Sequence, residues 1–247
     1  STDSVKFTGI TTNDKLVVDS ITAGTNATTD AQYAAAVVKG TSSVGTLELN
    51  NNTSAGTITI GNSSGTGFET LNIAATGKNT VGGSGIVSKG AKTVTLSATG
   101  ATDVTISSDV ASKGTLTVTG AGKVTLNTLD TAFDTVDASG NSGGIVVTDV
   151  GDAKTVYTLS SGDDKFTTAA DGFATSDKFA VAAGGGTGDE LVVAAAADLD
   201  TAAEGARYTG FEKLTVSDSQ DVSLTSGITA LKVTGATTNK TLSNISA

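Results

Sequence analysis

The chain has no cysteine, histidine, methionine, tryptophan or proline, and only one arginine, Arg207. Without cysteine it cannot form disulfide bonds. Without cysteine or histidine it lacks the usual side chains of thiol nucleophiles and imidazole bases. No apolar run approaches the ~18 residues of a transmembrane helix. We therefore expect no membrane insertion, and no catalysis that depends on the missing residue types.

Aromatic residues make up only 4% of the 247 residues, and the net charge is −10. Proteins that bind nucleic acid neutralise phosphates with clustered lysine and arginine, so we expect no nucleic acid partner. Acidic side chains alone could still serve a glycosidase or a β-helix polysaccharide lyase. Such sites combine acids with basic groups and an aromatic platform, for which one arginine and three tyrosines are a poor supply. The sequence therefore predicts no enzymatic activity.

Threonine is the commonest residue, and short runs of alternating apolar and polar residues occupy most of the chain. Between residues 94 and 156 these runs follow one another about every ten residues, a spacing found in sandwiches, barrels and solenoids. Each run carries only two or three apolar residues, and the Asn-Gly and Asp-Gly pairs of tight hairpins are nearly missing. The sequence thus predicts an all-β, parallel β-solenoid or β-helix-like fold with short helical insertions, in which two strands form a turn of about twenty residues.

A seven-residue phrase recurs at residues 67–73, 132–138 and 210–216, each time with a phenylalanine and an acid before an alternating strand. We expect the three phenylalanines to fill the core, and the acids to cap turn amides or pair with a lysine. These residues are Phe68, Phe133 and Phe211, followed by Glu69, Asp134 and Glu212.

Two stretches favour helices. Thr29 and Asp30 could cap a helix over residues 29–40 that stops at Gly40, and the alanine-rich residues 194–204 end at Gly205. Each stretch lies between a short acidic phrase and a Phe-Glu phrase, an order that indicates duplication.

We accordingly predict two related units. The first covers residues 1–158, with the helical insertion at about 29–40 and a strand ladder over about 67–158. The second covers residues 159–247, with strands at 222–224 and 231–233. Because the second unit has few strands, we expect it to be truncated and the natural protein to continue beyond Ala247.

Glycine and aspartate gather before several strands. Residues 184–192 resemble the calcium-binding nonapeptide Gly-Gly-x-Gly-x-Asp-x-hydrophobic-x, apart from Thr187 at the third glycine position. Calcium binds carboxylate and carbonyl oxygens in tight turns, so the sequence predicts calcium as a cofactor. Ordinary turn chemistry explains the same residues and stays the alternative. The candidate metal-site residues are Asp14, Asp163, Asp164, Asp177, Gly188 and Asp189, with Asp164 and Asp189 foremost.

The glycine-rich acidic turn at residues 184–193, the alanine-rich spacer and the Gly-Phe-Glu-Lys-Leu strand at 210–216 together resemble a known family. They are similar to the lattice-forming region of Gram-negative surface-layer proteins of the type I secreted, repeat-in-toxin-related group, such as those of Caulobacter and Campylobacter. The resemblance implies an extracellular, calcium-assisted, self-assembling β-solenoid on the bacterial cell surface.

We therefore expect a structural protein segment that forms a two-dimensional extracellular lattice with copies of itself. The resemblance also implies attachment to cell-surface polysaccharide through a region outside this chain. The alternative is a calcium-binding repeat module of a large secreted bacterial adhesin. A lattice protein should form ordered sheets by itself, whereas an adhesin repeat should stay monomeric and bind a host surface.

Overall fold

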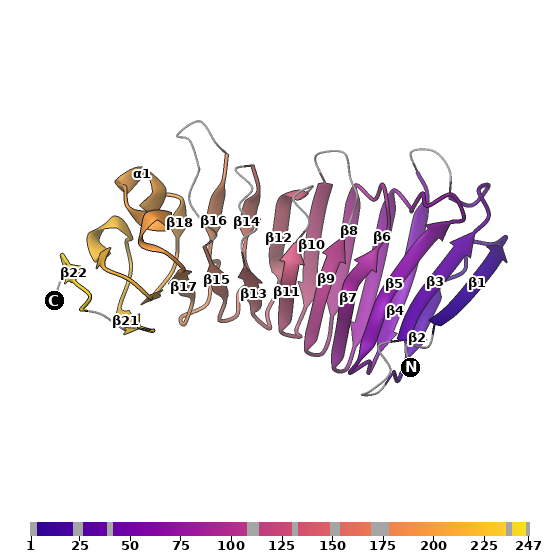
Figure 1. Cartoon of the computed structure of the whole chain (residues 1–247), viewed down its shortest axis with the longest axis horizontal. Coiled ribbons are helices and arrows are strands. Elements are labelled where there is room, and N and C mark those ends of the chain that lie inside the picture. The colour runs from indigo at the N-terminus through magenta and orange to yellow at the C-terminus, as the bar shows by residue number, and fades with distance from the viewer. Residues whose placement is uncertain are drawn as a thin grey trace.

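Parallel β-strands build almost the whole protein (Figure 1). The computed structural model describes residues 4–21, 27–38, 42–107, 114–129, 133–148, 154–168, 178–235 and 239–245. Odd-numbered strands form an eleven-stranded sheet, here sheet A, and even-numbered strands form a nine-stranded sheet, here sheet B. Because the chain alternates between the two sheets and always pairs in parallel, it winds as a coil. The predicted β-solenoid is confirmed.

Sheet A contains β1 (Ser4–Ile10), β3 (Ala27–Tyr33), β5 (Ala55–Asn62), β7 (Asn79–Val87), β9 (Thr102–Ser107), β11 (Val124–Leu129), β13 (Ile145–Thr148), β15 (Lys165–Thr167), β17 (Glu190–Val193), β19 (Lys213–Val216) and β21 (Ala230–Val233). Sheet B contains β2 (Leu16–Asp19), β4 (Val44–Asn50), β6 (Thr70–Thr76), β8 (Thr93–Ala98), β10 (Gly114–Gly120), β12 (Phe133–Asn141), β14 (Val156–Thr158), β16 (Ala180–Ala182) and β18 (Tyr208–Thr209). A two-stranded sheet of β20 (Gln220–Asp221) and β22 (Leu242–Ser243) lies near the C-terminus.

The register between strands gives the length of each turn. In sheet B, Thr70 pairs with Thr93, Thr93 with Thr115, Thr115 with Thr135, and Thr135 with Val156. Successive turns therefore contain 23, 22, 20 and 21 residues. The predicted turn of about twenty residues is confirmed.

The core lies between the two sheets and consists of rows of aliphatic side chains. One row runs through Leu47, Ile73, Leu96 and Val118, which occupy neighbouring positions on successive strands of sheet B and are all buried. Threonines at the alternate positions point outward, as the period of two requires. Each turn adds one thin apolar layer, so the turns depend on their neighbours for burial.

The phenylalanines of the repeated phrase fill this core as predicted, since Phe68, Phe133 and Phe211 are each at most 2% exposed. A second aromatic cluster lies further along the coil. Tyr157 packs edge-on against Phe166, with ring centroids 5.1 Å apart. These large rings fill the interior where the strands shorten to three residues.

The helix predicted over residues 29–40 is wrong. Residues 27–33 form strand β3, which pairs with β1 on one side and β5 on the other. Thr29, Ala31 and Tyr33 are buried while the residues between them are not, the alternation of a strand. Pairing on both sides therefore outweighs the local helix preference of the alanines. Residues 39 and 40 lie outside the described part of the chain.

The second helical stretch is partly confirmed. It contains a short 3₁₀ helix, η1 (Ala196–Leu199), and a single α-helical turn, α1 (Ala202–Gly205). The hydroxyl of Thr201 accepts from the amide of Glu204, whose carboxylate accepts from the Thr201 amide, a capping box. Residues 222–224, predicted as a strand, instead form the 3₁₀ helix η2 (Val222–Leu224), while residues 231–233 lie in strand β21 as predicted. No helix in the described ranges is long and apolar enough to cross a membrane.

Both sheets continue past residue 158, through β12–β14–β16 and β13–β15–β17. The strand ladder also begins before residue 67, with β1 to β5 already part of it. The division into two related units at residue 158 stays a prediction about duplication, and the ladder passes through it without interruption.

Glycines stack at one corner of the coil, in the turns that lead from sheet B into sheet A. A Cβ atom at Gly100 would overlap the carbonyl of Gly77, and one at Gly122 would overlap the carbonyl of Gly100. Successive turns approach so closely here that a side chain has no room.

We expect Gly100→Ala to destabilise the protein by about 1–3 kcal/mol, because the backbone of a whole turn must shift to admit the methyl group. Gly185→Ala is the matched control, since its Cβ would come no closer than 3.8 Å to any atom. Urea unfolding followed by circular dichroism measures both. Equal stability of the two variants would contradict the proposed stack.

Candidate functional site

A row of polar side chains follows the stacked glycines, just before the strands of sheet A. Near the N-terminus, the buried Asn52 donates to the carbonyl of Val18 (2.8 Å) and to Oδ1 of Asn79 (3.2 Å). Two aspartates and a glutamate occupy the corresponding corner near the C-terminus, at positions 164, 189 and 212. These side chains satisfy backbone groups that leave the ladder at the corner.

Asp164 acts as such a cap. Its Oδ1 accepts from the amide of Ile145 (2.6 Å) and the hydroxyl of Ser160 (2.6 Å), and its Oδ2 accepts from the Ser160 amide (2.8 Å). Only 2% of the residue is exposed. Burial raises the pKa of Asp164, although the hydrogen bonds from Ser160 and Ile145 oppose that rise. The carboxylate thus has a full structural role before any ligand is considered.

Asp189 occupies the next turn and is fully buried, but only one of its oxygens is satisfied. Oδ1 accepts from the amide of Asp164 at 2.7 Å, whereas the buried Oδ2 has no hydrogen-bond partner. Burial raises the pKa of Asp189 to about 6, and the carboxylates of Asp164, Glu212 and Asp163 push it in the same direction. A buried anion without a partner is costly, so this oxygen calls for a proton or a cation.

Glu212 extends the row by one more turn. Its Oε2 accepts from the amide of Asp189 at 3.0 Å, while the Asp189 carbonyl accepts from the amides of Glu212 and Lys213. We call Asp163, Asp164, Gly188, Asp189 and Glu212 the acidic corner.

Gly188 is the meeting point of opposite charges at this corner. A Cβ there would lie 2.8 Å from the carboxylate of Asp163 and 2.8 Å from the ammonium of Lys213. Asp163 and Lys213 are both exposed. The protein therefore places one of its own cations beside these acids, where it competes with any bound metal ion.

The structure brings together four of the six residues predicted for the metal site: Asp163, Asp164, Gly188 and Asp189. Asp14 is exposed near the N-terminal end of the coil, where its side chain accepts from the hydroxyl of Thr12. Asp177 lies outside the described residues. Across the described ranges, no three acidic side chains converge in an arrangement that would hold a metal ion. The calcium role of these residues stays a prediction.

The sequence interpretation missed Glu212 and Ser160 as members of this site. The signal for Glu212 was present, because the acids of the Phe-Glu phrase were predicted to cap turn amides or pair with lysine. Glu212 does cap the Asp189 amide, and Glu69 pairs with Lys92 at 3.0 Å. Ser160 carried no signal in a sequence so rich in serine.

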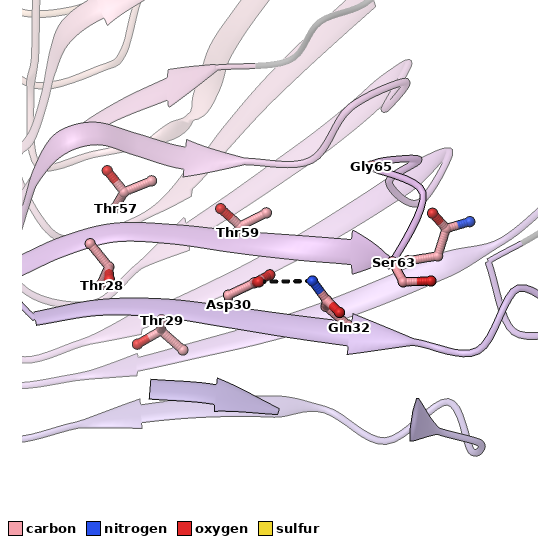
Figure 2. Close-up of a pocket in the computed structure, with 9 residues that line it drawn as sticks. Thr28, Thr29, Asp30, Gln32, Thr57, Thr59, Ser63 and Gly65 are labelled. Atoms are coloured by element: carbon pink, nitrogen blue, oxygen red, sulfur yellow. Dashed lines mark hydrogen bonds between the residues drawn. The ribbon is translucent and has the colours of Figure 1, made fainter. Parts of the chain in front are cut away.

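A second feature is a shallow groove of about 340 Å³ on β3 and β5 (Figure 2). Its lining is polar, and Gln32 donates to Asp30 across 2.9 Å within it. Lys6 of the neighbouring strand β1 lies 3.8 Å from the same carboxylate. The lining residues are Thr28, Thr29, Asp30, Gln32, Thr57, Thr59, Asn62, Ser63 and Gly65. The groove offers hydrogen-bond donors and acceptors but no aromatic stacking surface.

Comparison with known proteins gives no relative: no protein-family model, no curated protein and no solved structure matches this chain.

Asp164→Asn and Asp189→Asn should change stability in opposite directions at neutral pH in chelator. The first places an amide group against the donors that Asp164 now accepts, and should lower the free energy of unfolding by about 1–3 kcal/mol. The second removes a buried, unpartnered charge and should raise it by a similar amount, about 1–3 kcal/mol. Thermal melts measure both, and a loss of stability in both variants would show that Asp189 is already satisfied.

The gain from Asp189→Asn should depend on pH. The pKa of Asp189 is about 6 in the folded protein, above the ordinary 3.8. Between these values the folded chain binds more protons than the unfolded chain, so the stability of the wild type rises as pH falls through about 6. The advantage of the variant should therefore be largest above about pH 6 and shrink toward about pH 4. Urea unfolding at several pH values in chelator tests this, and a gap that stays constant would rule out the titration.

Proposed function

We propose that this chain is a structural segment of a bacterial surface layer, a self-assembling extracellular protein that forms a two-dimensional lattice. The observation that carries the proposal is the uninterrupted parallel ladder. Sheets of eleven and nine strands run along the long axis of the molecule (Figure 1). A rod held by backbone hydrogen bonds over its whole length is suited to bear load and to tile a surface.

The outer faces support the same proposal. Rows such as Thr93, Thr115 and Thr135 repeat from turn to turn on sheet B, so the surface is regular as well as polar. A regular surface presents the same contact at each step, which favours ordered packing of many copies. The composition adds resistance to damage, since cysteine, methionine and tryptophan are absent from a protein proposed to face the environment.

Calcium is part of this proposal, through the acidic corner. Asp189 would supply its unpartnered Oδ2, and Asp163 an exposed carboxylate next to it. A divalent cation would neutralise carboxylates that now repel one another, and would stabilise the folded chain by mass action. Asp164 would act mainly as the cap that holds the corner in shape, because its two oxygens already accept three hydrogen bonds.

One observation favours a second function, that of a binding module in a large secreted adhesin. The groove on β3 and β5 combines a carboxylate, amides and hydroxyls on one rigid face (Figure 2). Such a lining suits a hydroxylated ligand such as a glycan. An adhesin module would use this groove as a monomer, whereas a surface-layer segment would not need it.

Negative-stain electron microscopy of the purified chain, with calcium and with chelator, tests the proposal. We expect ordered sheets in calcium and their loss in chelator. Asp189→Asn should form no sheets in calcium, while Asp14→Asn, which changes an acid far from the corner, should behave as the wild type. Monodisperse particles in both conditions, together with binding of a soluble glycan, would favour the adhesin module instead.

A further inference from the structure

The two ends of sheet A are open and apolar. In the described part of the chain, β1 and β21 each pair with one strand only, β3 and β19 respectively. They lie at opposite ends of the long axis (Figure 1). Unpaired strand edges bind other strands readily unless they are blocked by charge, bulges or covering segments.

At the N-terminal end, Val5 and Phe7 point along the core side of the sheet. Val5 pairs with the buried Thr29 and Phe7 with the buried Ala31, so the two side chains continue inward-facing rows. Each is nevertheless 47% exposed, because no further turn packs over them.

The C-terminal end has the same pattern. Leu231 pairs with Leu214 and Val233 with Val216, both buried partners, yet Leu231 is 37% and Val233 is 44% exposed. Leu214 and Leu231 also line a hollow of about 230 Å³ at this edge, which leaves room for an incoming side chain.

These two ends complement each other. Each terminal strand presents two apolar residues two positions apart, with a lysine between them that points outward: Lys6 in β1 and Lys232 in β21. All strands of sheet A run in the same direction, so β1 of a second molecule can add to β21 in parallel and keep every apolar row inward. In that register Val5 would follow Leu231, and Phe7 would follow Val233.

We propose that a second copy of this chain binds end to end, with its β1 added to β21 of the first, so that the β-solenoid continues from one molecule into the next. The contact joins two different surfaces and does not close on itself, so it produces linear rows. The inference rests on the proposed self-assembly and identifies one of its contacts. Lys6 and Lys232 would come close together across the joint, and Asp30 and Glu190 on the neighbouring strands only partly offset their repulsion. Association should therefore strengthen with ionic strength.

Two variants that block one end each test the proposal. Phe7→Asp places a charge at the N-terminal end and Val233→Asp at the C-terminal end. In analytical ultracentrifugation in chelator, we expect the wild type to form a concentration-dependent series of oligomers and each variant alone to be monomeric. An equimolar mixture should form a one-to-one dimer and nothing longer, because only one pair of intact ends remains. Val156→Asp is the matched control, since Val156 is an exposed apolar residue (37%) in the middle of sheet B, and it should oligomerise as the wild type does.

Several results would overturn the inference. These are a monomeric wild type at all concentrations, single variants that still dimerise, or no dimer in the mixture although circular dichroism shows both variants folded. If either variant fails to fold, Val5→Lys and Leu231→Lys block the same ends.

The outcome is separable from that of the lattice proposal. Calcium-dependent sheets formed equally well by Phe7→Asp would refute the end-to-end contact and leave the lattice standing. Linear rows without sheets in calcium would do the reverse.

Discussion

Hydrogen bonds between successive turns are the interaction on which the rest of this structure depends. Neighbouring parallel strands lie about 4.8 Å apart, and this spacing applies to every part of a turn, including the corners. Where the backbone turns from sheet B into sheet A, the spacing leaves no room for a Cβ, and glycine follows glycine along the axis. Where the ladder leaves an amide without a carbonyl, a buried asparagine or aspartate side chain accepts from it instead.

The acidic corner shows how one geometry serves two purposes. Asp164 and Asp189 both satisfy the backbone of the neighbouring turn, but only Asp164 has both of its oxygens hydrogen-bonded. The difference comes from Ser160, which donates twice to Asp164, while the turn before Asp189 offers glycines in its place. The same turn chemistry therefore yields a complete cap in one turn and an unsatisfied carboxylate in the next. A structural origin for these aspartates and a capacity to bind a cation are compatible.

Much of the fold could be predicted from local pattern. The ten-residue spacing of short alternating runs gave the parallel coil and its turn length, and the Phe-Glu phrase gave buried rings and capping acids. The prediction failed at residues 29–40, where alanines favour a helix but Ala31 and Tyr33 lie in register with β1 and β5. Contacts with neighbouring turns decided that segment, and a single stretch of sequence does not contain them. The same reason explains the site: the bond from Asp164 to Asp189 spans 25 residues, and Ser160 gains its role only from the conformation of one turn.

The constancy of register along the coil has a consequence for the size of the protein. Turns of 20 to 23 residues in β6 to β14 differ in their loops, yet their strands meet in the same apolar rows. A duplicated or deleted turn would leave the cross-section, the rows and both ends unchanged, and would alter only the length, by about 4.8 Å. The molecule is in this sense a ruler with a fixed graduation. In-frame duplication could adjust the spacing between whatever lies at its two ends without the invention of a new core.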